Sequence, residues 1–221
     1  MKPPGGSPGR YWQNWDQGRA ARLIDEYWTG DPREAEWREM LARDIRQELG
    51  TDATVLEAGC GSGLVYGALL RHQVIRPDSY AGEDMSEKML EIARERFPGV
   101  RFSKMDILAL PSPDRAHDAV VCVDVLQHLP YYDVALRELV RVTGRKLYIA
   151  SWFTPGPEDA VAFSPPYTRF DNQSFHDNCY SLPRFVAALR SCEGREIVDT
   201  RIHQFLGRRY AVCATFAPGR G

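Results

Sequence analysis

Residues 55–67, VLEAGCGSGLVYG, combine an apolar run with four glycines. Glycine costs stability inside regular structure, so this density indicates that something must approach the backbone closely. The stretch lies where a predicted strand passes into a predicted helix. A helix N-terminus offers unpaired N–H groups and the positive end of the helix dipole. The pattern therefore predicts a loop that holds a nucleotide-type cofactor.

The spacing of the glycines separates the candidate cofactors. A dinucleotide site requires G-x-G-x-x-G, but counting from Gly59 places Leu64 where the third glycine should be. The stretch also lacks the G-K-[ST] of a phosphate-binding loop. Glu57, two residues before the first glycine, would repel a pyrophosphate and would suit a ligand with an ammonium or sulfonium group. The charge of Glu57 therefore argues against NAD and ATP.

His128 is the best candidate for a catalytic base. It follows the apolar run 117–125, which predicts a buried strand, and ligands of open α/β folds bind at the carboxyl ends of strands. An unperturbed imidazole titrates near neutrality. The alternative is that His128 only orients its loop or borders the cofactor. His176, in a long irregular segment, is the second candidate.

Strands and helices alternate around these residues. The sequence predicts strands at 53–58, 79–84, 100–105, 117–125 and 145–153, and helices at 33–49, 64–72, 86–97 and 131–142. Such alternation indicates βαβ units and a parallel sheet that is covered on both faces. Ser86 is the expected cap of the helix at 86–97.

The alternation ends after residue 153. Residues 154–180 contain prolines, glycines and aromatics without a regular period, and a segment of that length is usually functional or disordered. A helix at 181–190 and two strands near 195–204 and 208–216, paired as a hairpin, follow. The predicted fold class is α/β: a doubly wound, mostly parallel seven-stranded sheet with helices on both faces and a C-terminal antiparallel hairpin.

Composition limits the class of protein. The chain has 221 residues, 43% of them hydrophobic, which suits one globular domain spanning 1–221. A formal net charge of -2 argues against nucleic acid as the partner. Five cysteines without C-x-x-C spacing argue against a disulfide framework and a zinc site, and favour a cytoplasmic protein. The sequence offers neither a signal peptide nor an apolar run of membrane-spanning length, so no membrane partner is expected.

Four segments, in order, resemble the motif series of the class I (Rossmann-like) S-adenosylmethionine-dependent methyltransferases. They are VLEAGCGSG, YAGEDMSEKMLEIARERF, KMDILALP and HDAVVCVDVLQHL. The resemblance extends over roughly residues 33–152. It implies S-adenosyl-L-methionine as the cofactor, and it says almost nothing about the methyl acceptor.

The resemblance implies a role for the glycine loop. Residues 57–63, Cys60 among them, would hold the methionine portion of the cofactor. Gly59 and Gly61 would allow it to approach the backbone, and Gly63 closes the loop. Glu57 is the acidic member of the loop, although it could also simply end its strand.

Further roles follow the next strand ends. Asp84 would accept hydrogen bonds from both ribose hydroxyls, which a carboxylate can do because it has two acceptor oxygens. Met85 would lie against the adenine. Asp106, with the backbone of Ile107, would bind the adenine amino group, and Asp124 would border the methionine ammonium.

Some of these positions allow a plainer role. Position 83, usually apolar in the family, is Glu83 here and competes with Asp84 for the ribose. Asp84 could also only cap a turn, Met85 could belong to the core, and Asp106 could be a turn former.

Aromatic residues gather before the core and after the fifth predicted strand. In the resembled family these two regions cover the substrate. The candidates for contact with the methyl acceptor are Tyr11, Trp12, Trp15, Trp152, Phe153, Tyr167 and Arg169. Aromatic walls would suit an apolar or planar substrate, or a cation. The same aromatics could instead fasten the two regions to the body.

The sequence thus predicts one methyltransferase domain. Its parts are an N-terminal extension belonging to a substrate lid, a cofactor-binding core, a substrate-covering insertion, and a C-terminal helix with a strand pair, at 1–32, 33–153, 154–180 and 181–217. The expected reaction moves a methyl group by in-line displacement to an O or N atom of a small molecule, in bacterial specialised metabolism. The alternatives are an RNA or protein acceptor, or a cofactor-binding partner protein without turnover.

Overall fold

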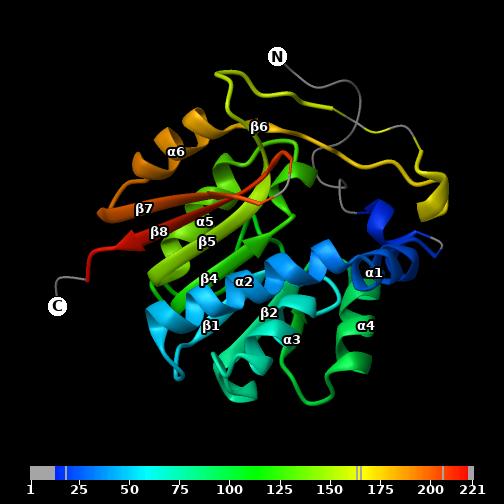
Figure 1. Ribbon diagram of the computed structural model, residues 1–221, viewed down its shortest axis with the longest axis horizontal. Coiled ribbons are helices and arrows are strands. Elements are labelled where there is room, and N and C mark those ends of the chain that lie inside the picture. The colour runs from blue at the N-terminus through cyan, green and yellow to red at the C-terminus, as the bar shows by residue number, and fades with distance from the viewer. Residues whose placement is uncertain (1–12, 18, 163, 165, 206, 219–221) are drawn as a thin grey trace.

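The protein is described by a computed structural model covering residues 13–17, 19–162, 164, 166–205 and 207–218. Within this part of the chain, one sheet runs in the order β3-β2-β1-β4-β5-β8-β7, with β6 paired to β5 (Figure 1). The strands are β1 Val55–Ala58, β2 Tyr80–Asp84, β3 Phe102–Lys104, β4 His117–Val123, β5 Thr143–Thr154, β6 Tyr180–Ser181, β7 Ile197–Gln204 and β8 Arg209–Phe216.

Neighbouring strands from β3 to β5 are parallel, whereas β8 is antiparallel to both β5 and β7. The predicted fold class is therefore confirmed, including the C-terminal hairpin. The two-residue strand β6 was not predicted, because its pairing with the end of β5 is a tertiary contact.

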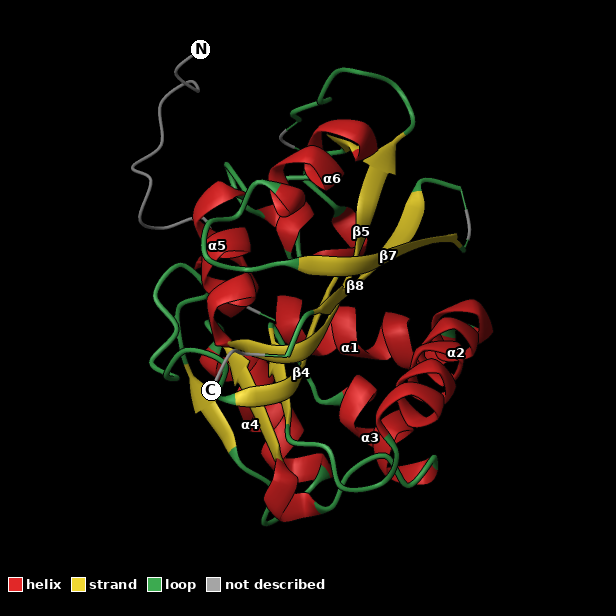
Figure 2. Cartoon of the chain, turned by 90° about the vertical axis from the view of Figure 1, so that its left-hand side faces the viewer, coloured by secondary structure: helices red, strands yellow, loops and turns green. Residues whose placement is uncertain are grey.

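Helices cover both faces of the sheet, as Figure 2 shows. They are α1 Ala20–Gly30, α2 Pro32–Leu49, α3 Leu64–Arg71, α4 Glu87–Arg96, α5 Asp133–Val142 and α6 Leu182–Arg190. Ser86 caps α4 as predicted, because its side chain accepts a hydrogen bond from the Met89 amide. Among the described residues no helix is long and apolar enough to cross a membrane.

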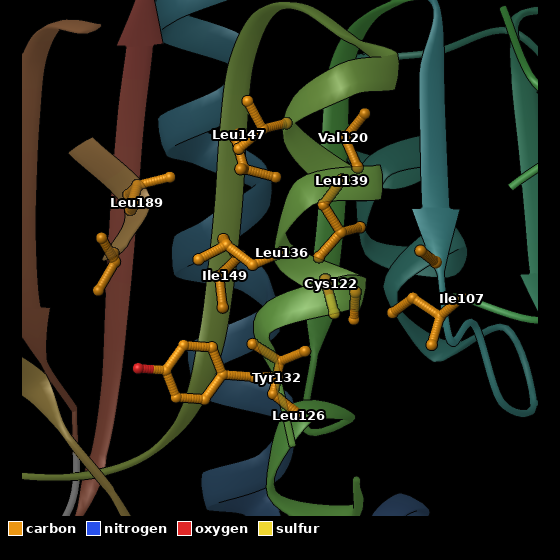
Figure 3. Packing of buried hydrophobic residues seen from close by; sticks show 14 of the residues in the cluster. Ile107, Val120, Cys122, Leu126, Tyr132, Leu136, Leu139, Leu147, Ile149 and Leu189 are labelled. Carbon is orange, nitrogen blue, oxygen red and sulfur yellow. The ribbon is translucent and has the colours of Figure 1, made fainter. Parts of the chain in front are cut away.

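Strand β4 shows why this sheet needs two layers of helices. Val120 and Cys122 point into the core shared with α5 and α6, and both are fully buried. Ala119 and Val121, the alternate residues, are equally buried in the core shared with α2 and α3. Side chains of a strand alternate between faces, so an unbroken apolar run requires cover on both sides. Figure 3 shows the first of these cores.

Helix α1 was not predicted. Ala20, Ala21 and Ile24 form its buried face, and they pack with Phe170 and Phe175 of the segment after β5. The amphipathic pattern is short, and its partners lie about 150 residues away in the sequence, so the contact was not visible from local periodicity. The N-terminal part of the chain is thereby joined to residues 154–180.

Leu136 of α5 offers a test of the core. It is 2% exposed, and Figure 3 shows it between β4 and β5. We expect Leu136→Ala to lower the free energy of unfolding by about 2–5 kcal/mol, because it removes buried methyl groups and leaves a cavity. Val134→Ala on the same helix, where the side chain is 43% exposed, should change it by only about 0.5 kcal/mol. Urea denaturation measures both, and equal losses would contradict the packing described.

Candidate active site

The glycine loop joins β1 to α3 at the carboxyl edge of the sheet. The amides of Gly59 and Cys60 both donate to the carbonyl of Glu83, at 2.6 and 3.0 Å, which ties the loop to the end of β2. Gly59, Gly61 and Gly63 have φ angles of 83°, 51° and 79°, in the left-handed region that favours glycine.

Gly59 and Gly63 also have packing reasons of their own. A Cβ atom on Gly59 would lie 2.1 Å from Cγ2 of Val125, and one on Gly63 would lie 3.1 Å from Cζ of Phe102. One on Gly61 would meet the ring of Trp28 at an ordinary contact distance of 3.5 Å. The protein's own side chains therefore approach the backbone of this loop closely. The sequence had predicted that only a ligand does so.

A cavity opens beside this loop, at the ends of β1, β2 and β4. The empty space around it, its open mouth included, is about 1060 Å³. Of the predicted cofactor residues, those that line it are Glu57, Gly59, Cys60, Gly61, Asp84, Met85, Ile107 and Asp124. Gly63 lies behind the lining as the N-terminal cap of α3.

Glu57 is buried in the wall of this cavity, with 2% of its surface exposed. Burial raises the pKa of its carboxyl to about 8. The hydroxyl of Tyr80, which donates to Oε2 at 2.5 Å, lowers this pKa, and the nearby charge of Asp84 raises it. At neutral pH the carboxyl is mostly protonated unless a cation lies against it. The sequence predicted a charged carboxylate here, because the burial of Glu57 is set by the fold and not by its neighbours in the chain.

Asp84 holds the loop in place. Its Oδ2 accepts from the Gly61 amide at 2.9 Å and its Oδ1 accepts from the Ser86 amide at 2.8 Å. Glu83 also lines the cavity, and its Oε2 is buried with no hydrogen-bond partner among the described residues. Burial raises the pKa of both carboxyls. Each has acceptor capacity left, so the competition between them for a ligand stays open.

Asp106 lies outside the lining of the cavity as far as the described residues define it. Its Oδ1 accepts from the Leu108 amide at 2.9 Å, and its carbonyl accepts from the Ala109 amide. The side chain therefore forms the turn that the sequence analysis offered as the alternative, while its neighbour Ile107 reaches the cavity.

Asp124 belongs to a buried network that the sequence did not reveal. Nη2 of Arg209 lies 2.9 Å from its Oδ2, and Nη1 of the same guanidinium lies 3.0 Å from Oε1 of Glu34. Arg38 lies 3.9 Å from the other oxygen of Glu34, which also accepts from the indole of Trp37. Burial raises the pKa of Asp124 to about 6, and Arg209 opposes this. The only signal in the sequence was the i, i+4 pairing of Glu34 and Arg38.

His128 lines the same cavity, and its ring orientation is fixed from behind. Nδ1 lies 2.5 Å from the carbonyl of His176 and 3.7 Å from Oδ1 of Asp177. A carbonyl can only accept, so Nδ1 carries the hydrogen and Nε2 is the basic atom of the neutral ring. The hydroxyl of Tyr167 donates to the other oxygen of Asp177 at 2.5 Å. Burial lowers the pKa of His128, whereas the His176 carbonyl and Asp177 oppose that change.

The other histidine candidate has a different place. His176 lines neither this cavity nor the second one described below, in the part of the chain described. Its backbone carbonyl serves His128 instead.

The predicted acceptor contacts divide into groups. Trp15 lines the cavity, 5.0 Å between ring centres from His128, and Trp152 lies 6.4 Å from the same histidine. Phe153 does not reach a cavity: it is fully buried and packs on Phe185 of α6, so its prediction as an acceptor contact is corrected. Tyr11 and Trp12 lie outside the described residues.

Tyr167 and Arg169 act as fasteners, the alternative raised for the aromatics. The guanidinium of Arg169 lies over the rings of Tyr27, Tyr167 and Phe170, at 4.7–5.5 Å. Since Tyr27 belongs to α1, this contact joins the N-terminal part to residues 154–180. Among the described residues, neither Tyr167 nor Arg169 lines either of the two cavities.

A second cavity adjoins the first. It has about 620 Å³ of empty space and is lined by Tyr27, Asp31, Arg33, Glu34, Trp152, Arg208 and Arg209. Glu34 lines both cavities, so the pair that it forms with Arg209 lies between them.

Residues 55–146 match the family model of a methyltransferase domain. A fatty-acid O-methyltransferase of Mycolicibacterium smegmatis is 38% identical over 90 residues, which cover 40% of this chain and 32% of that protein. Methyltransferase GfsG of Streptomyces halstedii is 31% identical over 138 residues, 58% of this chain and 49% of that protein. The chain thus matches half or less of the length of these relatives.

Two solved structures share the fold over most of the chain. One is the [4+2]-cyclase SpnF, with a TM-score of 0.70, 19% identity and 99% of each chain covered. The other is a 1,6-didemethyltoxoflavin-N1-methyltransferase of Burkholderia thailandensis with bound 1,6-didemethyltoxoflavin and S-adenosylhomocysteine. Its TM-score is 0.70 at 17% identity, with 99% of this chain and 94% of that chain covered.

The packing of Gly59 against Val125 can be tested with a matched glycine. Gly99 has a similar φ of 86°, but a Cβ there would meet nothing within 4 Å. We expect Gly99→Ala to cost about 1–2 kcal/mol of unfolding free energy from the backbone conformation alone. Gly59→Ala should cost about 2–5 kcal/mol, because the overlap with Val125 adds to that strain. Chemical denaturation of both variants compares them, and equal losses would show that the valine contact matters little.

Proposed function

We propose that this chain, whose residues 55–146 match the methyltransferase family model, is a class I S-adenosylmethionine-dependent methyltransferase that methylates a small molecule at an oxygen or nitrogen atom. The observation that carries the proposal is the cavity beside the glycine loop. A buried carboxyl, Glu57, and a histidine with a fixed tautomer, His128, line the same space.

The residues of the cavity fit this cofactor. Met85, Met105 and Ile107 give it an apolar part that suits an adenine. Glu83 offers a buried oxygen that lacks a hydrogen-bond partner among the described residues, and Asp84 has acceptor capacity beside it. We assign the ribose to these two carboxyls, Asp84 first, and the methionine ammonium to Glu57 and Asp124. The bound cofactor supplies a methyl group that its positive sulfur has already activated for displacement.

The side chain of His128 determines which acceptors suit the site. Neutral imidazole with its lone pair on Nε2 can take a proton from a hydroxyl or from a protonated nitrogen as the methyl group is transferred. The His176 carbonyl and Asp177 then stabilise the imidazolium that forms. This arrangement favours a hydroxyl acceptor, since a neutral amine needs no base.

A small acceptor also suits the way in which the site is covered. We propose that the N-terminal part and residues 154–180 form one lid. The side chain of Asn14 donates to the carbonyl of Ser174, and the Arg19 amide donates to Asp171 at 2.9 Å. Two of the relatives are named for small molecules, a fatty acid and a didemethyltoxoflavin. Both observations support a small acceptor over RNA or protein.

The first test is catalytic. Purified protein with tritium-labelled S-adenosylmethionine and a panel of hydroxylated small molecules should label at least one of them. His128→Gln should lower kcat/KM for that acceptor by about 10²–10⁴, the usual contribution of a general base, with S-adenosylhomocysteine affinity unchanged. His203→Gln, at an exposed histidine on β7, is the matched control and should keep full activity. Tight binding without transfer to any acceptor would favour the non-catalytic alternative.

The second test uses the pKa of Glu57. A ligand ammonium pairs with the ionised carboxyl, so binding must displace a proton below a pKa of about 8. The affinity for S-adenosylhomocysteine should therefore rise from pH 6 to pH 8, by at most about tenfold per pH unit. Glu57→Gln can still accept from Tyr80 but cannot ionise. Its affinity should be lower and should rise less with pH, since only Asp124, with a pKa of about 6, still ionises near the ammonium in this range. Isothermal titration at pH 6, 7 and 8 measures both proteins.

Stability of the ligand-free protein should move in the opposite sense. The folded carboxyl keeps its proton up to about pH 8, while the unfolded one loses it near its ordinary value of 4.5. The folded state thus binds more protons in this interval, and the contribution of Glu57 to the unfolding free energy falls as pH rises.

A wild-type binding profile as flat as that of Glu57→Gln would contradict the assignment of Glu57 to a cation.

A further inference from the structure

The second cavity contains more positive than negative side chains. Three arginines, Arg33, Arg208 and Arg209, line it together with two carboxylates, Asp31 and Glu34. Both carboxylates are already engaged. Asp31 accepts from Nε and Nη2 of Arg33, at 3.0 and 2.6 Å, and Glu34 lies 3.0 Å from Arg209.

Arg208 is the remaining charge of this lining. Among the described residues its guanidinium has no ion pair. It contacts the thiol of Cys179 and opposes the rise that burial causes in the pKa of that thiol. The side chain is exposed, and its guanidinium carbon lies 5.8 Å from the ring centre of Trp152. A guanidinium stacked near an aromatic ring keeps a planar fork of donors, which matches a carboxylate.

The position of Trp152 connects this charge to the proposed reaction. Its ring lies 6.4 Å from the ring of His128, which lines the first cavity. Trp152 therefore lies near both the Arg208 guanidinium and the proposed base. Tyr27 lines the same cavity and provides a second aromatic wall.

We propose that the second cavity binds the methyl acceptor, and that the acceptor is a planar, hydroxylated aromatic acid whose carboxylate pairs with Arg208. The inference rests on the proposed function, since it names the substrate class of the same site. The carboxylate is the group that is recognised, while the hydroxyl that is methylated lies toward His128. Arg209 cannot take this role, because Glu34 and Asp124 already neutralise it.

Binding of simple probes tests the inference without turnover. Isothermal titration of protein saturated with S-adenosylhomocysteine would use 4-hydroxybenzoate, its neutral counterpart 4-hydroxybenzamide, and 4-hydroxyphenyl phosphate. We expect the benzoate to bind at least about tenfold more tightly than the amide, the usual size of a charge-assisted hydrogen bond. Arg208→Gln should abolish that difference and leave the amide unchanged. Arg190→Gln, at an exposed arginine that ends α6, is the matched control and should behave as wild type.

The outcomes separate the two proposals. Equal binding of benzoate and amide, or an Arg208→Gln effect on both, would overturn the acid site while S-adenosylhomocysteine binding leaves the proposed function intact. Tighter binding of the phosphate would overturn the assignment to a carboxylate. Loss of S-adenosylhomocysteine binding in wild type would overturn the proposed function, and the titrations repeated without it would still measure the dependence on Arg208.

Discussion

Four carboxyl groups meet at the ends of three adjacent strands, and the rest of the site depends on how their burial is compensated. Glu57 is the last residue but one of β1, Glu83 and Asp84 end β2, and Asp124 follows β4. Parallel strands bring such ends to one edge of the sheet, where burial disfavours the charged form of each acid. Backbone amides hold Asp84, a tyrosine hydroxyl holds Glu57, and an arginine pairs with Asp124. These three carboxyls therefore have different partners, whereas Oε2 of Glu83 has no hydrogen-bond partner among the described residues.

That compensation depends on distant parts of the chain. Arg209 comes from β8, at the far end of the sequence, and Glu34 and Arg38 come from α2, before the first strand. They meet only because β8 inserts next to β5 and α2 packs on the face of the sheet that also carries α3. The network therefore ties the hairpin of β7 and β8 and helix α2 to the cavity. Both elements become part of the candidate site as well as of the fold.

The distinction between local patterns and contacts among distant residues explains what the sequence could and could not predict. Apolar periodicity, the Ser86 cap and the glycine spacing are local, so the sheet, most helices and the loop beside β1 were predictable. The ionisation of Glu57 depends on burial, and the neutralisation of Arg209 depends on residues up to 175 positions away. Phe153 and Trp152 are neighbours on one strand and face opposite sides, so composition alone could not tell which of them reaches a cavity. Helix α1 was missed because its buried face is completed by Phe170 and Phe175.

The packing of residues 154–180 on α1 and the orientation of His128 are not independent. Asp177 lies in the segment that packs on α1, and it contacts both His128 and Tyr167. Tyr167 in turn lies beneath Arg169, which also covers Tyr27 of α1. A movement that lifted this segment from the N-terminal helix would therefore also withdraw the carbonyl and the carboxylate that fix the imidazole. In the proposed function, His128 would be oriented for proton transfer only while this segment packs on α1, because the His176 carbonyl sets the tautomer of the histidine.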